Sequence, residues 1–520
     1  MGGIISAGSK STAQVGADVL ASGGNAVSAA VAACFATLSS EPALTSLGGG
    51  GIMMMSNRKR RIHKCVNFFS NMPGLTLKPI HKRKHDFHSI ALDYLGVKQN
   101  ISIGKGSAAC GDAIHALCEI AKTLGNKPIS ELTAATIKNL NTGVSLDPSQ
   151  RQFSEQLVPI YKASKKAKNI FVPENENYNK SYIYSNPDAA NFLEGLSDKY
   201  WRSFYKTHFY NKVFEEFGPA EGGLITLKDL ESFKSLVQEP LVARYKNTRI
   251  MLPPKPSGAG ELIASALNHL DKVVHKDLHE RKLLKYLCYT LHSLSQLRIT
   301  FPGKSLELLA QQWMMQHFKD SLNRPFSILE KEKQSKSSTT HISVIDDQET
   351  AVSITFSHGE GCGHMVGDTG IMMNNFIGEE DHLPTGFNPK LSGQRVPTMI
   401  APTIMETKEG DLYAFGSGGS SRIRSTILQI ILNIAERKKD PVEAVSAPRI
   451  HVENGVIYSE ICRDNKWIQE ELSTLQPLGF NPFKEKHLYF GGVNLVKLDA
   501  HGKFSGVGDT RRGGACLIVD

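Results

Sequence analysis

The 520-residue sequence predicts an α+β protein. Two runs rich in β-branched residues, 340–345 and 351–356, flank the polar stretch 346–349, which predicts two strands joined by a turn. Residues 26–38 form an Ala-rich apolar run that is too short for a membrane span, so we expect a buried helix there. The Lys-rich stretch 150–335 is predicted to be mainly helical.

The N-terminal elements follow from local signals. The segment Gly2–Gly8 (GGIISAG) fits a loose myristoylation pattern, but an opening core strand is the preferred interpretation. The four residues Ser11–Gln14 have the form of a capping box, so we expect a helix that begins there and ends at Gly23-Gly24. Asn25 then begins the Ala-rich helix.

A hairpin and another helix are predicted further along. Residues 51–55 and 64–69 are expected to pair through the basic turn 57–61. That turn could contact nucleic acid, but no aromatic residues interleave with it to stack on bases. A solvated hairpin tip is therefore the preferred interpretation, and no nucleic-acid partner is expected. After Asp112, an amphipathic stretch ended by Gly125 predicts a helix.

Composition places the chain among ordinary globular proteins. Hydrophobic residues make up 40% and charged residues 21%, which excludes disordered, collagen-like and disulfide-dense classes. The 60 Lys and Arg residues against 51 Asp and Glu residues give +9, a mild excess for this length. The 8 cysteines contain no CxxC pattern, which predicts reduced thiols and a cytoplasmic location. No membrane association is expected, because no apolar run reaches about 18 residues and the first residues lack a secretory basic region.

The most informative boundary lies near residue 338. Residues 331–338 are polar and aperiodic, which predicts an exposed loop, and the predicted strand 340–345 follows at once. Such a junction suits a protein that is cut there. A cut before a threonine creates a base beside its hydroxyl, because the new α-amine has a pKa of about 7.7–8.0. Without a cut, the same residues are a β-prone entry into the strand, and spacing alone favours that simpler interpretation.

Seven short motifs, spread in order over nearly the whole chain, outweigh the simpler interpretation. They are Gly23–Val27, Glu41-Pro42 with Leu47–Gly51, Thr339–Val344, Gly370–Asn375, Ala401–Ile404, Gly416–Arg422 and Ala447–Arg449. In type and order they resemble the motifs of the gamma-glutamyltranspeptidases. The resemblance implies an N-terminal-nucleophile hydrolase fold, a four-layer αββα sandwich. It also implies a precursor that cleaves itself before the nucleophile Thr339, giving a large subunit, 1–338, and a small subunit, 339–520.

The resemblance assigns further roles around the nucleophile. The hydroxyl that supports the nucleophile's amine falls on Ser357. Gly359 stands where the family usually has an asparagine that contacts the donor. The acidic residue that holds the donor's α-amino group falls in the run 379–381, with Glu380 preferred over Asp381.

Gly419 and Ser420 correspond to the family's oxyanion pair. Their place in the sequence agrees with that role, since a Gly-rich loop there runs into the apolar stretch 423–437. The helix predicted for that stretch would direct N–H groups at developing negative charge.

Two positions depart from the family and concern the donor. Phe69 stands where an arginine binds the donor's α-carboxylate. Pro397 and Thr398 stand where a serine pair joins that arginine, so Thr398 is the remaining candidate to bind substrate there. Ordinary hydrogen bonds seldom replace a bidentate charge-assisted pair, so donor recognition is expected to differ from the family's.

Two further clusters have simpler interpretations than catalysis. The segment His358–His364 spaces His and Cys residues as zinc ligands can be spaced, but a fourth ligand is missing and the family uses no metal. A Gly-rich loop beside the site is preferred, and neither a metal nor another cofactor is expected. The charged turn Asp509–Gly514 resembles the family's closing segment, and its arginines are interpreted as structural ion-pair partners.

The sequence therefore predicts an acyltransferase of the gamma-glutamyltransferase or glutathione hydrolase type. Thr339 would attack glutathione or a related γ-glutamyl amide, and the acyl group would pass to water or an amine. One alternative keeps fold and self-cleavage but takes a glutaryl-type donor, which Phe69 favours. Another is an uncleaved, inactive scaffold. The expected partners are a small-molecule donor and acceptor and the two subunits of one precursor.

Overall fold

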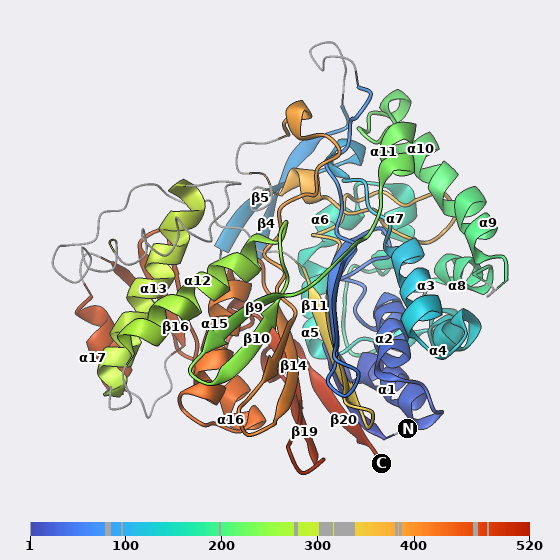
Figure 1. The fold of residues 1–520 in the computed structure, drawn as a ribbon. Coiled ribbons are helices and arrows are strands. Elements are labelled where there is room, and N and C mark those ends of the chain that lie inside the picture. Colours follow the sequence, from blue (N-terminus) through green and yellow to red (C-terminus); the bar gives the residue numbers. More distant parts are fainter. Residues whose placement is uncertain are drawn as a thin grey trace.

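The structure is a computed structural model that describes residues 2–77, 85–94, 97–196, 199–274, 279–300, 316, 338–379, 383, 387–460, 466–475 and 478–520. Its centre is a pair of stacked β-sheets with helices on both outer faces (Figure 1). The two ends of the chain lie close together at one end of the strands (Figure 1). This four-layer arrangement confirms the predicted αββα sandwich.

The first sheet contains the strand that follows residue 339. Its strands are β1 (Gly3–Ala7), β2 (Gly50–Asn57), β3 (Ile62–Asn67), β8 (Leu236–Gln238), β11 (Thr340–Asp346), β12 (Thr350–Ser357) and β20 (Ala515–Val519). They are ordered β20-β1-β11-β12-β2-β3-β8, and all neighbours run antiparallel. Strand β11 is therefore paired on both sides, by β1 and by β12.

The second sheet stacks on the first. Its strands are β9 (Leu241–Tyr245), β10 (Thr248–Leu252), β13 (Thr403–Glu406), β14 (Leu412–Gly418), β18 (Gly492–Leu498) and β19 (Phe504–Gly508). They are ordered β19-β18-β14-β13-β10-β9, again antiparallel. Smaller sheets are formed by β15 (Ile450–Glu453), β16 (Val456–Glu460) and β17 (Gly479–Phe483), by β4 (His88–Tyr94) and β5 (Val97–Ile103), and by β6 (Val144–Ser145) and β7 (Ile183–Tyr184).

Helices from the first half of the chain cover the first sheet. Two of them, α1 (Lys10–Ala21) and α2 (Ala26–Ser40), pack directly on its strands. The other helices of this half are α3 (Ala113–Leu124), α4 (Ile129–Thr142), α5 (Pro148–Gln156), α6 (Val158–Tyr161), α7 (Lys165–Phe171), α8 (Pro187–Glu194), α9 (Trp201–Tyr205), α10 (Asn211–Phe217) and α11 (Leu227–Ser232). A π-helical turn, Lys206–Tyr210, joins α9 to α10.

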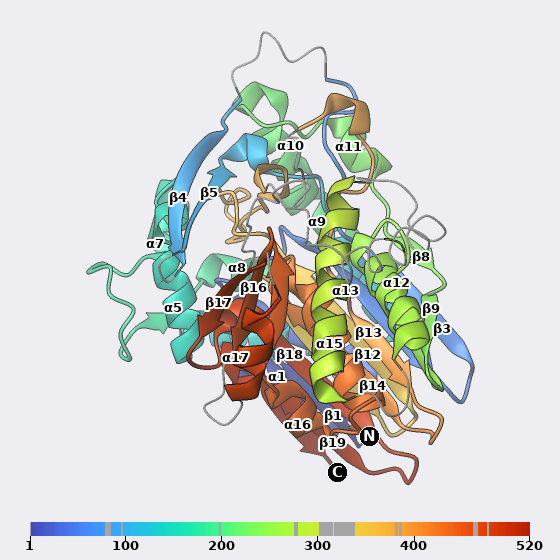
Figure 2. The same cartoon turned by 90° about the vertical axis from the view of Figure 1, so that its left-hand side faces the viewer.

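The other face of the sandwich is covered by later helices (Figure 2). They are α12 (Gly258–Val273), α13 (Glu280–Thr300), α15 (Arg422–Ala435), α16 (Pro441–Ser446) and α17 (Lys466–Ser473). Helix α12 packs on β9 and α15 packs on β14. Of the helices that the structure describes, none combines the length and the apolar composition needed to cross a membrane.

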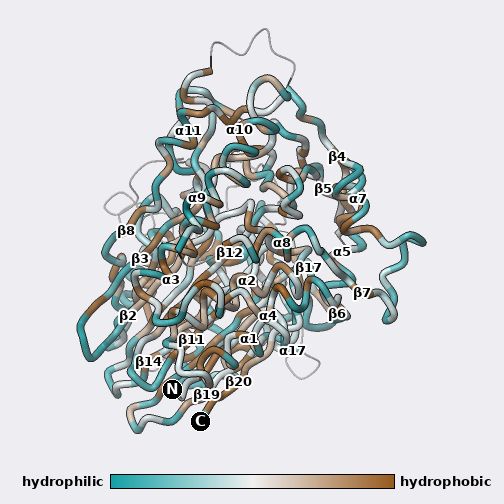
Figure 3. Tube along the Cα trace, turned by 90° about the vertical axis from the view of Figure 1, so that its right-hand side faces the viewer, coloured by the Kyte–Doolittle hydropathy of each residue, from teal (hydrophilic) through white to brown (hydrophobic). Residues whose placement is uncertain are grey.

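Three layers of buried apolar side chains hold the sandwich together. Ile5 packs between the first sheet and its helices, Ile4 and Ile404 pack between the two sheets, and Phe415 and Ile427 pack between the second sheet and its helices. Ile4 and Ile5 are neighbours in β1 but enter different layers, because successive strand side chains point to opposite faces. Outside these layers the chain is more hydrophilic, as along the loop that leads into β7 (Figure 3).

Most predicted elements are confirmed, with one shifted start. Of the predicted exposed loop 331–338, residues 331–337 lie outside the described residues, and Ser338 is buried because its hydroxyl and its carbonyl are both hydrogen-bonded inside the protein. The opening strand, the Ala-rich helix after Asn25, the 51–69 hairpin, the helix after Asp112 and the strand pair after residue 339 are all present. The N-cap of the first helix, however, lies two residues before the predicted one. It is Ser9, whose Oγ accepts a hydrogen bond from the N–H of Thr12 at 3.1 Å. Ser9 has the extended backbone that an N-cap needs, whereas Ser11 already lies within the helix.

A polar cluster of His341, Ser343, Thr355 and Asn494 links the two sheets. The ring of His341 forms hydrogen bonds of 2.8 Å with the hydroxyls of both Ser343 and Thr355. The side-chain amide of Asn494, on β18, donates to the backbone carbonyl of His341 at 2.7 Å, and the backbone carbonyl of Asn494 accepts from the Ser343 hydroxyl at 3.0 Å. Burial lowers the pKa of His341 to about 3, so the imidazole is neutral at physiological pH.

The neutral His341 makes stability depend on pH. Below about pH 6.5 the unfolded chain binds a proton that folded His341 takes up only near its pKa of about 3, so its contribution to the free energy of unfolding is lost as the pH falls. The test compares two chains that both carry Thr339→Ala, one with His341 and one with His341→Gln. We expect the difference between their free energies of unfolding to decrease by about 2 kcal/mol from about pH 7 to about pH 5. Denaturant unfolding at the two pH values measures this. Glu41, whose pKa burial raises to about 7, has the opposite trend but is common to both chains. Parallel pH dependences would contradict the assignment.

Candidate active site

The residues on either side of the predicted cleavage point lie in a buried position at the start of β11. The register of β11 and β12 pairs Thr340 with Phe356, so Thr339 comes opposite Ser357, the last residue of β12. Thr339 Oγ1 donates to Ser357 Oγ at 3.2 Å, and Ser357 Oγ donates to the carbonyl oxygen of Ser338 at 2.6 Å. The threonine hydroxyl therefore lies close to the carbonyl of its own preceding peptide bond.

The glycine-rich segment at the end of β14 lies against the main chain of Thr339. A Cβ at Gly418 would stand 2.2 Å from the carbonyl oxygen of Thr339, so this contact requires glycine. The next two residues, Gly419 and Ser420, have φ values of +122° and +53°. A positive φ costs a non-glycine residue about 1–2 kcal/mol, and such strain concentrates at functional sites. Helix α15 begins at Arg422, directly after this segment.

Two neighbouring arginines near the C-terminus have different surroundings. Arg511 is buried in ion pairs with Glu460 at 2.5 Å and Asp509 at 3.2 Å, as the structural interpretation predicted. Arg512 instead lies beside the glycine-rich segment, where its Nη1 would stand 3.2 Å from a Cβ at Gly418. Burial lowers the pKa of Arg512 to about 10, so it is still a cation at neutral pH. Sequence reasoning did not distinguish these two arginines, because both belong to one charged turn.

Gly359 lies beside one acidic residue of the expected run 379–381. Its N–H donates to Ser357 Oγ at 3.0 Å, and its φ is +69°. A Cβ at Gly359 would stand 2.0 Å from Oε1 of Glu379, so the buried Glu379 carboxylate contacts this glycine. Glu380 and Asp381 lie outside the described residues. The signal that could have identified Glu379 is its position, since it is the acidic residue nearest to the motif 370–375.

Thr398 and Phe69 lie in surroundings that differ from those expected. Thr398 is buried, forms a bridge with Ser257, and its Oγ1 accepts from the N–H of Ile400 at 3.2 Å. The hydrogen bonds described for it do not reach Thr339. Phe69 packs between the two sheets with its ring centroid 4.4 Å from that of Phe376, and it is fully buried. An arginine at position 69 would therefore lie in an apolar core.

The loop His358–His364 carries no metal-like grouping. Within the described part of the chain, no three His, Cys, Asp or Glu side chains converge as metal ligands would. Burial lowers the pKa of His358 to about 4 and raises that of the Cys362 thiol to about 12. The segment is a Gly-rich loop beside Ser357, which was the preferred interpretation.

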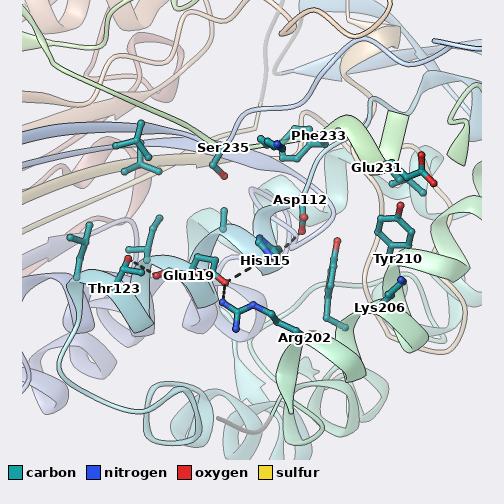
Figure 4. A pocket seen from close by; sticks show the side chains of 18 of the residues that line it. Asp112, His115, Glu119, Thr123, Arg202, Lys206, Tyr210, Glu231, Phe233 and Ser235 are labelled. Carbon is teal, nitrogen blue, oxygen red and sulfur yellow. Dashed lines mark hydrogen bonds and ion pairs between the residues drawn. The ribbon is translucent and has the colours of Figure 1, made fainter. Parts of the chain in front are cut away.

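A further cavity lies away from Thr339. It has a volume of about 700 Å³ and lies between α3, β3 and α9 (Figure 4). Two of its acidic side chains have partners within the wall: Asp112 accepts from the N–H of His115, and Glu119 pairs with Arg202 (Figure 4). Thr339 and Ser357 do not line it.

The αββα sandwich places a threonine at the start of a central strand, with its hydroxyl beside the preceding carbonyl. This arrangement defines the class of N-terminal-nucleophile hydrolases. The family model described as Gamma-glutamyltranspeptidase matches residues 12–519. The chain therefore belongs to the gamma-glutamyltranspeptidase family, which confirms the resemblance found in the sequence.

Named relatives fall into two groups. The glutathione hydrolase proenzyme of Bacillus subtilis (strain 168) is 25% identical, over 100% of this chain and 92% of its own length. The acylase ACY 1 proenzyme of Pseudomonas sp. (strain V22) is 24% identical, over 97% of this chain and 91% of its own length. Among solved structures, cephalosporin acylase from Bacillus halodurans superposes with a TM-score of 0.80 at 20% identity, covering 99% of this chain and 95% of that one. This last likeness supports the fold.

The close approach of Gly418 to Thr339 generates a prediction. Gly418→Ala places a methyl group where the Thr339 carbonyl oxygen lies, so the threonine must move. A displacement of about 1 Å at a reacting group can cost about a hundredfold in rate, and we expect a loss of that order in both self-cleavage and turnover. Intact mass and an amide-hydrolysis assay measure the two. The matched control is Gly258→Ala, whose new Cβ would meet only the flexible end of Met399 at 3.2 Å. Normal processing of Gly418→Ala would show that the glycine-rich segment does not constrain Thr339.

Proposed function

We propose that this chain is a precursor that cleaves itself between Ser338 and Thr339 and then acts as a gamma-glutamyl transferase or hydrolase. The observation that carries the proposal is the hydrogen-bonded series from Thr339 Oγ1 through Ser357 Oγ to the Ser338 carbonyl, at 3.2 and 2.6 Å. Membership of the gamma-glutamyltranspeptidase family supports the same reaction. The proposed large and small subunits are residues 1–338 and 339–520.

Self-cleavage would use the groups already in place. Thr339 Oγ1 adds to the Ser338 carbonyl carbon, and the negative charge that develops on the carbonyl oxygen is stabilised by the Ser357 hydroxyl that donates to it. The threonine's proton passes to the amide nitrogen as the C–N bond breaks, which leaves an ester and a free α-amine. Water then hydrolyses the ester, giving a carboxylate on Ser338 and restoring the Thr339 hydroxyl.

Turnover would repeat the attack on an external amide. The new α-amine, with a pKa of about 7.7–8.0, takes the proton of Thr339 Oγ1 as the hydroxyl attacks the donor. The N–H groups of Gly419 and Ser420 are proposed to receive the oxyanion, since they follow the glycine that touches Thr339. We now prefer Glu379 as the acid that holds the donor's α-ammonium, because its carboxylate contacts Gly359 beside Ser357.

A second candidate function keeps this chemistry but changes the donor to a glutaryl-type or other side-chain amide whose recognition needs no arginine at position 69. The observation that favours it is the burial of Phe69 against Phe376 in the core, which leaves no guanidinium at that position. The relative named as an acylase is in keeping with such a change.

The nucleophile assignment predicts the fate of the purified chain. Wild type should give two fragments, whereas Thr339→Ala should stay whole because its methyl group cannot attack the Ser338 carbonyl. Intact-mass spectrometry measures both. Thr340→Ser is the matched control, since it changes the adjacent residue but keeps a hydroxyl near Glu41, and it should still be cleaved. Cleavage of Thr339→Ala at the same bond would rule out Thr339 as the nucleophile.

The two candidate functions predict different donor preferences. If Glu379 holds an α-ammonium, a γ-glutamyl anilide should have a kcat/KM about tenfold or more above that of a glutaryl anilide, which lacks this group, because a charge-assisted contact contributes about 1.5–3 kcal/mol. Glu379→Gln should remove most of this preference. Rates of aniline release measure both. A glutaryl anilide that reacts faster with wild type would replace the first candidate function by the second.

A further inference from the structure

The loop His358–His364 has an unusual backbone that directs one carboxylate inward. Three of its glycines, Gly359, Gly361 and Gly363, have φ values of +69°, +85° and +82°. The two N–H groups at its start are fixed, because Gly359 donates to Ser357 Oγ at 3.0 Å and Glu360 donates to Asn375 Oδ1 at 2.8 Å. The backbone at Glu360 is thus anchored on both sides.

The side chain of Glu360 ends at the residue before the scissile bond. Glu360 is fully buried, and its Oε2 accepts a hydrogen bond of 2.7 Å from the hydroxyl of Ser338. A hydrogen bond to a buried carboxylate is among the stronger ones in proteins. Neither the expected fold nor the catalytic roles assigned above require this carboxylate.

Two anchors close together in the chain, one at the end of β12 and one in the loop that follows, therefore hold Ser338. Its carbonyl oxygen accepts from Ser357 Oγ at 2.6 Å, and its own hydroxyl donates to Glu360 at 2.7 Å. Because one anchor holds the carbonyl and the other holds the side chain of the same residue, together they limit rotation about the Cα–C bond of Ser338. Because Thr339 is held beside β11, this rotation turns the Ser338–Thr339 peptide plane and changes φ of Thr339 with it, and so decides which face of the carbonyl carbon is turned toward Thr339 Oγ1.

We infer that Glu360 is a positioning residue for self-cleavage, which acts by holding the Ser338 hydroxyl so that the Ser338 carbonyl faces Thr339. The inference rests on the proposed function, because it concerns the step that activates the precursor. Glu360 forms no bond to the reacting carbon and takes no proton in this role. Its effect on the rate comes from orientation, which is effective when reacting atoms are already near one another.

The test is a double-mutant cycle on the cleavage rate. Wild type, Ser338→Ala, Glu360→Ala and the double variant are made by cell-free translation, and the intact chain is followed over time by mass spectrometry. Each single variant should slow cleavage by about tenfold to a hundredfold, the range expected for a charge-assisted hydrogen bond. The double variant should be no slower than the slower single one, since both changes remove the same contact.

Conservative variants separate positioning from a general structural role. Ser338→Thr keeps the hydroxyl and should restore cleavage to within a few-fold of wild type, and Glu360→Gln, which keeps an acceptor oxygen, should lose less than Glu360→Ala. The matched surface control is Glu349→Ala, whose carboxylate pairs with Arg58 at the far end of the β11–β12 hairpin and should leave the rate unchanged. If Glu360→Ala has a lower melting temperature than Thr339→Ala, the cycle is completed with Glu360→Gln.

The outcomes distinguish this inference from the proposed function. If wild type is cleaved but Ser338→Ala is cleaved at the normal rate, the role of Glu360 is overturned and the proposed function is not. The same holds if wild type is cleaved and the losses of the two single variants multiply in the double variant. A wild-type chain that stays intact overturns the proposed function, and the inference with it. Equal, non-additive losses that Ser338→Thr rescues support the inference.

Discussion

The hydroxyl of Ser357 connects the groups on which the candidate site depends. It accepts from Thr339 Oγ1 and from the N–H of Gly359, and it donates to the Ser338 carbonyl. These three bonds use the one donor and both acceptor sites of a serine hydroxyl. They can form together because the β11–β12 register sets Thr339 opposite Ser357. A slip of one residue would turn the threonine to the other face of the sheet, so whatever holds the register also holds the site.

The strand order suits a chain that is cut before Thr339. In the first sheet β1, from the proposed large subunit, lies between β20 and β11, both from the proposed small subunit. In the second sheet β10 from the large part pairs with β13 from the small part. Separation of the two parts would break antiparallel ladders in both sheets and expose the core between them. Cleavage would therefore change the surroundings of Thr339 while the sandwich that positions it stays assembled.

Local signals in the sequence predicted most of the elements, but the surroundings of several candidate site residues depend on long-range packing. Ser9 and Ser11 are both good N-caps, and the choice between them depends on where β1 ends, which spacing does not reveal. Glu379 was one of three consecutive acids, and only the path of the backbone after the buried 370–375 motif brings it to Gly359. The sequence shows a phenylalanine at position 69. It does not show that the ring packs on Phe376 in the core, because that contact joins segments about 300 residues apart.

Recognition of the donor depends both on the residue types in the sequence and on long-range packing. A γ-glutamyl group carries an ammonium and a carboxylate, and the structure treats the two charges differently. Glu379 lies beside Gly359, close to Ser357, where a carboxylate can hold an ammonium. The expected carboxylate partner is replaced by the buried Phe69, and Arg395, which approaches the same segment, already donates to the backbone carbonyls of Phe69 and Lys234. A donor carboxylate would have to compete with these carbonyls, so under the first candidate function we expect the ammonium to contribute more to recognition than the carboxylate.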